Sequence, residues 1–141
     1  MKMNPYLWFN GNCEEAFKVY EKCFGGKIEA MLTHKGMPSN GQTLPNWEDK
    51  IMHAMMIVQG QMLMASDLPP DSYKAPVGMH VSVHIDDQAE TEKVFATLAE
   101  GGQVSVPLHE TFWAWKFGEL VDRFGTPWII NCPKPMDRPA S

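Results

Sequence analysis

The chain has little cysteine, no long hydrophobic run and no excess of basic residues. Its three cysteines among 141 residues form no C-x-x-C pair, which argues against a disulfide framework or a cysteine-rich zinc site and indicates a reducing cytosol. No stretch approaches the roughly 20 apolar residues of a membrane span, and Asn10-Gly11-Asn12 comes too early for a signal-peptide core. The net charge of −5 disfavours nucleic acid and anionic membranes as partners. We therefore expect a cytoplasmic protein with neither partner.

What is present is an internal repeat. Asn12-Cys13-Glu14-Glu15 resembles a capping box, and a run of apolar residues at helical spacing follows until Gly25-Gly26. Asp87-Gln88-Ala89-Glu90 begins a second copy 75 residues later, and Gly101-Gly102 ends it. The same offset matches Lys18-Val19-Tyr20 to Lys93-Val94-Phe95. Together these matches indicate an internal duplication within one domain.

Each predicted helix follows one strand and precedes three more. The runs that predict strands are Tyr6 to Phe9, Lys27 to Thr33, Ile51 to Val58, Gln61 to Ser66, Met79 to Ile85, Gln103 to Pro107, Lys116 to Val121 and Pro127 to Asn131. Gln59-Gly60 is typical of a hairpin turn.

Proline and glycine mark the segments between these elements. Gly36 to Asp49 is predicted to be a long loop, and Leu68 to Pro76 a link between the two halves. The segment 133–141 carries three prolines and is predicted to be a loose tail.

Several local motifs resemble one known family. They run from Tyr6-Leu7 through Gly11-Asn12-Cys13-Glu14-Glu15-Ala16, Phe24-Gly25-Gly26, Met52-His53-Ala54 and Ser66-Asp67 to Glu110-Thr111-Phe112-Trp113-Ala114, Phe117-Gly118 and Asp122-x-Phe124-Gly125-x-Pro127-Trp128. This set resembles the PhnB-like branch of the vicinal oxygen chelate superfamily, which includes glyoxalase I, extradiol dioxygenases and the bleomycin and fosfomycin resistance proteins.

The resemblance implies an α+β fold in a single domain, residues 1–135. Two tandem βαβββ modules, 1–67 and 78–132, would form curved mixed sheets around a cleft, with the helices on the outer face. It also implies a homodimer. Some relatives carry the name of a demethylubiquinone methyltransferase. The chain has no glycine-rich loop between a strand and a helix, so we do not expect a methyltransferase that uses S-adenosylmethionine.

Metal-dependent members of the superfamily place ligands on the first and last strands of each half. His80 fits one such position, but the 75-residue offset places Pro5 at its counterpart, and Ile129 and Met64 fall at the other two. Neither proline nor isoleucine can ligate, and methionine is a poor ligand for a hard divalent ion. We therefore expect no metal and no other cofactor. A divalent metal, if one binds, would need a rebuilt site from His53, His80 and Glu110.

Alternation along Met79 to Ile85 predicts which residues meet a ligand. His80, Ser82 and His84 share one face, which would line the cleft, and Pro5, Leu7 and Phe9 would be the matching positions in the first half. His53 and Met55 share a face of their strand, although alternation cannot fix which face is inward. The aromatic segment Glu110 to Phe117 supplies flat apolar surface. The predicted ligand-binding residues are His53, Met55, Ser82, His84, Trp113, Trp115 and Phe117.

These residues are consistent with two different functions. The protein would bind a small apolar or aromatic oxygenated molecule, or it would be a glyoxalase-like lyase, isomerase or dioxygenase-type enzyme. His80 and Glu110 would then transfer protons with help from His53. A dimeric scaffold with a vestigial cleft is a third reading. The missing metal ligands favour binding, whereas the row of histidines favours an enzyme.

Overall fold

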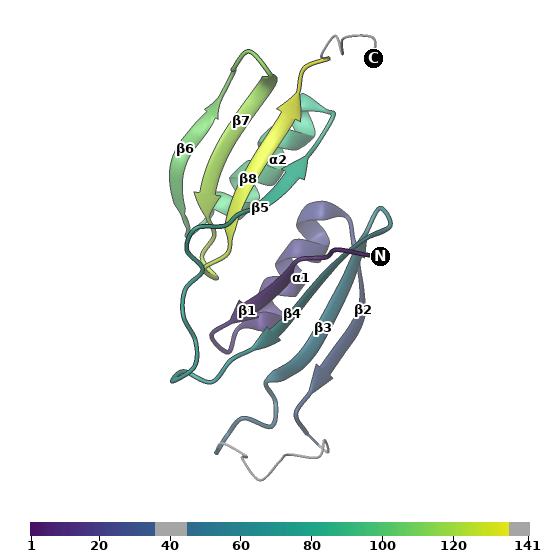
Figure 1. Cartoon of the computed structure of the whole chain (residues 1–141), viewed down its shortest axis with the longest axis vertical. Helices are drawn as coiled ribbons and strands as arrows, with labels where there is room; N and C mark the ends of the chain where they lie inside the picture. Colours follow the sequence, from purple (N-terminus) through teal and green to yellow (C-terminus); the bar gives the residue numbers. More distant parts are fainter. Residues whose placement is uncertain (36–44, 136–141) are drawn as a thin grey trace. The chain divides into compact units, whose positions relative to one another are not determined.

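The computed structural model describes residues 1–35 and 45–135, and its contacts divide the chain into two compact units, Met1–Lys74 and Ala75–Ser141. The first unit runs β1 (Tyr6–Phe9), α1 (Cys13–Phe24), β2 (Lys27–Thr33), β3 (Ile51–Val58) and β4 (Gln61–Asp67). The second runs β5 (Val81–His84), α2 (Gln88–Ala99), β6 (Gln103–His109), β7 (Ala114–Val121) and β8 (Pro127–Pro133) (Figure 1). The division falls within the predicted link.

Each unit is one mixed sheet with one helix against it. The strand orders are β1-β4-β3-β2 and β5-β8-β7-β6, and in each sheet the first strand pairs in parallel with the last while the other pairs are antiparallel. Both units therefore have the same topology. The predicted α+β fold of two βαβββ modules is confirmed. None of the described helices has the length and apolar character to cross a membrane.

The sequence placed most strands within two residues of their observed ends. β1, β2 and β3 have the predicted bounds, whereas β5 is shorter than Met79 to Ile85 and begins only at Val81, where pairing with β8 begins. β8 continues to Pro133 because Ala114, at the start of β7, pairs with it. The predicted tail therefore begins after this strand. Residues 136–141 of that tail, and residues 36–44 of the predicted long loop, lie outside the described residues.

The two helices begin differently, although both were predicted to begin with a capping box. The Asp87 side chain accepts a hydrogen bond from the Glu90 N–H at 2.8 Å, as predicted for α2. The Asn12 side chain makes no such bond. The Cys13 N–H is instead bound at 2.9 Å by Oδ1 of Asp67, whose Oδ2 accepts from the Ile51 N–H at 2.8 Å. A buried carboxylate from β4 thus caps α1 and ties it to β3.

A second buried carboxylate organises the turn between β7 and β8. Oδ1 of Asp122 accepts hydrogen bonds from the Phe124 and Thr126 N–H groups at 2.9 and 3.0 Å, and Oδ2 accepts from Trp128 Nε1 at 2.8 Å. Asp122 is 5% exposed and Trp128 is 1% exposed. The carboxylate therefore holds the turn and the largest core side chain of the second unit in one network.

The cysteines are free, and two of the three are buried. Cys13 and Cys132 lie in the interior, and Cys23 is half-buried. Burial raises the pKa of the Cys13 thiol above its ordinary value of 9.0, and the charges of Asp67 and Glu14 add to this effect. The folded state therefore holds the Cys13 proton at a pH where the unfolded chain loses it.

We expect this thiol to make the protein less stable in alkali. Above about pH 9 the unfolded state binds fewer protons than the folded state, so the free energy of unfolding falls by up to about 1.4 kcal/mol for each pH unit. Urea unfolding at pH 8, 9 and 10, compared with Cys13→Ala, measures this contribution. Equal slopes for the two proteins would contradict it. Cys23→Ala, a half-buried position on the same helix, serves as the control.

Candidate functional site

In each sheet the helix of the same unit packs against one face, and no described helix of that unit covers the other face. In the second unit, a Cβ on Gly118 would lie 2.7 Å from the ring of Phe95 on α2, and Lys116 pairs with Glu92 of the same helix. Residues 116 and 118 therefore face α2, and Phe117 and Glu119 face the opposite way. We call this opposite surface the open face of the second unit.

Strand register places two rows of side chains across this open face. His84, Asn131, Phe117 and His109 are successive partners in one row. Ser82, Ile129, Glu119 and Val106 form the neighbouring row. The alternation predicted for Ser82 and His84 is confirmed, since both are exposed while Val81 and Val83 are half-buried. The rows therefore combine polar groups with an aromatic ring.

Aromatic rings surround Phe117 on the open face. Its ring lies edge-to-face with those of Trp113 and His109, at centroid distances of 5.4 and 6.1 Å. Trp113 also contacts Phe112, which is 84% exposed. Of the aromatic residues predicted to bind a ligand, Trp113 and Phe117 are thus brought together. Trp115 lies instead at a register shift of β7, with Lys134 Nζ 4.8 Å from its ring centroid.

The polar groups of the open face include two that the sequence did not single out. Glu119 Oε1 lies 3.7 Å from His80 Nε2. Asn131 is 7% exposed, and its Oδ1 is buried with no hydrogen-bond partner among the described residues. Glu119 could have been found from the sequence, because Phe117 and Glu119 alternate with Gly118 and Leu120 along the strand. Nothing in the sequence distinguished Asn131 from a structural residue.

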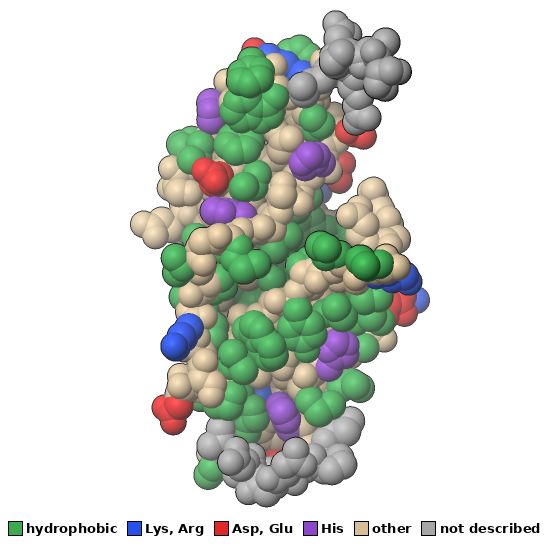
Figure 2. Space-filling view, viewed as in Figure 1, with side chains coloured by type: hydrophobic (Ala, Val, Ile, Leu, Met, Phe, Trp, Pro, Cys, Tyr) green, Lys and Arg blue, Asp and Glu red, His purple; other side chains and the backbone are tan. Residues whose placement is uncertain are grey.

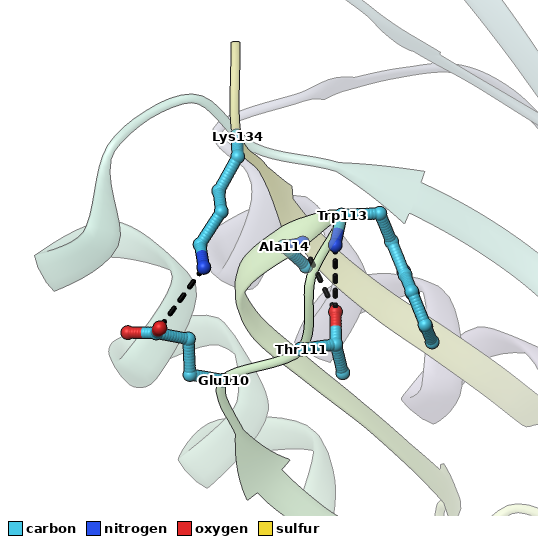
Figure 3. A network of polar contacts seen from close by, with 5 residues as sticks. All are labelled: Glu110, Thr111, Trp113, Ala114 and Lys134. Carbon is cyan, nitrogen blue, oxygen red and sulfur yellow. Dashed lines mark hydrogen bonds and ion pairs between the residues drawn. The ribbon is translucent and has the colours of Figure 1, made fainter. Parts of the chain in front are cut away.

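Glu110 and His80, the predicted proton-transfer pair, are not brought together. His80 directly precedes β5 and Glu110 directly follows β6, and these strands are opposite edges of the sheet. Three strand spacings put roughly 14 Å between these edge strands, and because both run in the same direction, His80 and Glu110 also lie at opposite ends of the sheet. Glu110 is held in its own turn, where Lys134 Nζ donates to it at 2.9 Å and the Thr111 hydroxyl accepts from the N–H groups of Trp113 and Ala114 (Figure 3). Its contacts are those of a loop residue.

The first unit presents an open face of different character. Phe9 packs against Phe17 and Tyr20 of α1, so its neighbours Tyr6 and Trp8 face the opposite way. Register continues the Tyr6 row across the sheet as Met64, Met55 and Ala30. Trp8 pairs with Ser66, and His53 pairs with Leu32. The predicted His53 and Met55 therefore lie on the open face. Hydrophobic side chains gather over this sheet, with histidines among them (Figure 2).

Tyr6 fixes the orientation of His53. Its hydroxyl lies 3.1 Å from His53 Nδ1, and the two rings stack at a centroid distance of 5.8 Å. Burial raises the pKa of the Tyr6 phenol, the Ser66 hydrogen bond opposes this, and the Cys13 charge adds to it. Tyr6 is therefore a neutral hydroxyl at physiological pH.

Register also corrects the matching of the two halves. A Cβ on Gly26 would meet Ile57 O at 3.0 Å, and one on Gly102 would meet Val121 O at 2.4 Å, so these glycines occupy the same place in their units. They are 76 residues apart, and the buried residues Phe9 and Ile85 share that offset. The offset of 75 holds for the two helices, from their starts to their ends, but not for the first strands. The prediction that Pro5, Leu7 and Phe9 are the inward positions was therefore wrong, because a slip of one residue exchanges the faces of a strand. Tyr6 and Trp8 instead lie on the face opposite α1, and both are exposed.

The corrected register does not supply a divalent metal site. The four positions that the superfamily implies are now occupied by Asn4, Met64, His80 and Ile129, of which isoleucine has no donor atom and methionine is a soft one. Across residues 1–35 and 45–135, no three His, Cys, Asp or Glu side chains are grouped as metal ligands. His80 and Glu110 lie beside opposite edge strands of one sheet. The residues present do not fit the implied ion.

Comparisons with known proteins agree with this architecture. A family model described as 3-demethylubiquinone-9 3-methyltransferase matches residues 1–131. Protein YjdN from Escherichia coli is 31% identical, over 95% of this chain and 97% of its own. The crystal structure of PA1353 from Pseudomonas aeruginosa is 46% identical, with a TM-score of 0.86 over 94% of this chain and 98% of that one.

A further solved structure carries the branch name. It is described as a putative 3-demethylubiquinone-9 3-methyltransferase, PhnB protein, from Bacillus cereus, and is 26% identical, with a TM-score of 0.77 over 93% of this chain and 98% of that one. Topology, motifs and these matches agree. The chain belongs to the PhnB-like family, the family whose model matches residues 1–131, and it has the fold of the vicinal oxygen chelate superfamily.

Proposed function

We propose that the protein binds a small, apolar or aromatic, oxygenated molecule on the open face of the second unit. The observation that carries this proposal is the row formed by His84, Asn131, Phe117 and His109, in which the Phe117 ring lies between polar side chains on three paired strands and the edge strand β6. Ligand sites combine apolar and aromatic surface with a few convergent polar groups. This surface has both.

The aromatic part of the row is suited to a flat ligand. Trp113 and His109 each lie in edge-to-face geometry with Phe117, and a ligand ring can add to such a cluster in offset or edge-to-face geometry. The polar part supplies orientation through Ser82, His84 and Asn131. On sequence grounds we also propose that the protein acts as a cytoplasmic homodimer, without a metal or other cofactor.

Titration with small aromatic alcohols and ketones, followed by amide chemical shifts, tests the proposal. We expect the shifts to concentrate on β5, β7 and β8. Phe117→Ala should weaken binding about tenfold, because loss of an aromatic contact costs about 0.5–1.5 kcal/mol beyond its buried area.

The control is Val104→Ala, which removes an apolar side chain that is 40% exposed and belongs to the row facing α2. It should leave binding unchanged. Shifts confined to the first unit, or equal losses for the two variants, would refute the proposal. S-adenosylmethionine belongs in the same titration because the family description names a methyltransferase. Its binding in place of the aromatic compounds would also count against the proposal.

A further inference from the structure

Asn131 is a buried residue whose main-chain groups make hydrogen bonds but whose side-chain oxygen makes none among the described residues. Its backbone pairs with His84 and Phe117, and its carbonyl accepts from the Ile85 N–H at 2.9 Å. The residue is 7% exposed, and Oδ1 is buried with no hydrogen-bond partner among the described residues. The amide therefore contributes nothing evident to the sheet.

Folded proteins pair nearly all buried polar atoms. Leaving one unpaired is unfavourable, and a carbonyl oxygen can be satisfied only by a donor. Asn131 shares its face with Phe117 and His84, so the missing donor would come from a molecule on the open face. The amide oxygen and the proposed ligand surface thus coincide.

We infer that Asn131 determines ligand specificity, and that its Oδ1 accepts a hydrogen bond from a neutral hydroxyl group attached to the ligand's aromatic ring. This inference rests on the proposed function. Phe117 and Asn131 are direct partners on β7 and β8, so a ring stacked on Phe117 carries its substituent next to the amide. The ligand class is therefore a phenol.

The charge nearby disfavours an anionic group in this place. A carboxylate or phosphate carries no proton for Oδ1 at neutral pH. Glu119 follows Phe117 by two residues on the same face, and its carboxylate repels an anion. Glu119 Oε1 also lies 3.7 Å from His80 Nε2. A neutral donor satisfies the amide without opposing that charge.

Three probes of similar shape separate the hydrogen-bond roles. Phenol offers a donor, acetophenone offers only an acceptor, and ethylbenzene offers neither. Dissociation constants come from amide shifts of the full-length protein. We expect phenol to bind at least tenfold more tightly than the other two, since a site built around a hydroxyl rejects analogues that lack it. In Asn131→Leu, which has a similar volume, the three constants should fall within about threefold of one another. Asn10→Leu, at an exposed position of the first unit, should keep the wild-type order.

Each result has a distinct meaning. Equal binding of the three probes at the open face would overturn the inference and leave the proposed function intact. Tightest binding of acetophenone would also overturn it, because the amide would then be donating. Preference for phenol that survives in Asn131→Leu would assign the specificity to another residue. No shift on β5, β7 or β8 with any probe would remove the proposed function itself. The order of the probes on the wild-type protein decides the first two cases without any variant.

Discussion

Replacing Asp122 with alanine lowers the free energy of unfolding by about 3–5 kcal/mol, because three donors lose their buried acceptor at once. The two turn N–H groups and the Trp128 indole would remain in the interior. Domains of ordinary stability have only about 5–15 kcal/mol in total. The variant should therefore be close to unfolded at physiological temperature.

Urea unfolding measures this loss, and two further variants interpret it. Asp122→Asn keeps the size and one acceptor oxygen but turns an N–H toward Trp128 Nε1, so its loss should be intermediate. Asp86→Ala removes an exposed carboxylate and should change stability by less than about 0.5 kcal/mol. A loss for Asp122→Ala no greater than that of Asp86→Ala would show that the network does not stabilise the second unit.

Asp67→Ala should produce the second largest loss, about 2–4 kcal/mol, for a related reason. It removes the cap of α1 and the acceptor for the Ile51 N–H, both buried. The effect belongs to the first unit, where the carboxylate joins a helix start to two strands.

Hydrogen exchange distinguishes this loss from that of Asp122. We expect amides of α1 and β3 to lose protection in Asp67→Ala, and amides of β7 and β8 to lose it in Asp122→Ala. Asp71→Ala, at an exposed position just after β4, is the control. If Asp67→Ala and Asp71→Ala behaved alike, the capping role of Asp67 would be disproved.

The strands and helices were largely predictable because local signals and tertiary packing agree. Glycines at the helix ends, the Gln59-Gly60 turn and the apolar runs all specify structure over a few residues, and they placed β1, β2 and β3 correctly. The start of α1 was different. Asn12 is a good local cap, but the acceptor that the helix uses comes from Asp67, which is distant in sequence.

The candidate site was predictable only in part, because register decides it. Alternation alone put Ser82 and His84 on one face, and the pairing of β5 with β8 confirmed this. Glu110 looked chemically competent within an aromatic segment, yet its partner is Lys134 and not a histidine. Asn131 could not be recognised from the sequence, because what distinguishes it is a buried Oδ1 with no hydrogen-bond partner among the described residues, and only the structure shows this.

The difference in offset between helices and strands constrains how the two halves can be recombined. From the matched residues Phe9 and Ile85 to the helix starts, the first half has one more residue than the second, and from the helix ends to Gly26 and Gly102 it has one fewer. A chimera that joins β1 to α2 at matched helix positions would shift the strand by one residue and expose Phe9. Junctions placed at Gly26 and Gly102 avoid this, because there the two halves keep the same spacing to their sheets. An extra residue before the helix and a missing one after it thus compensate each other, and neither can be exchanged alone.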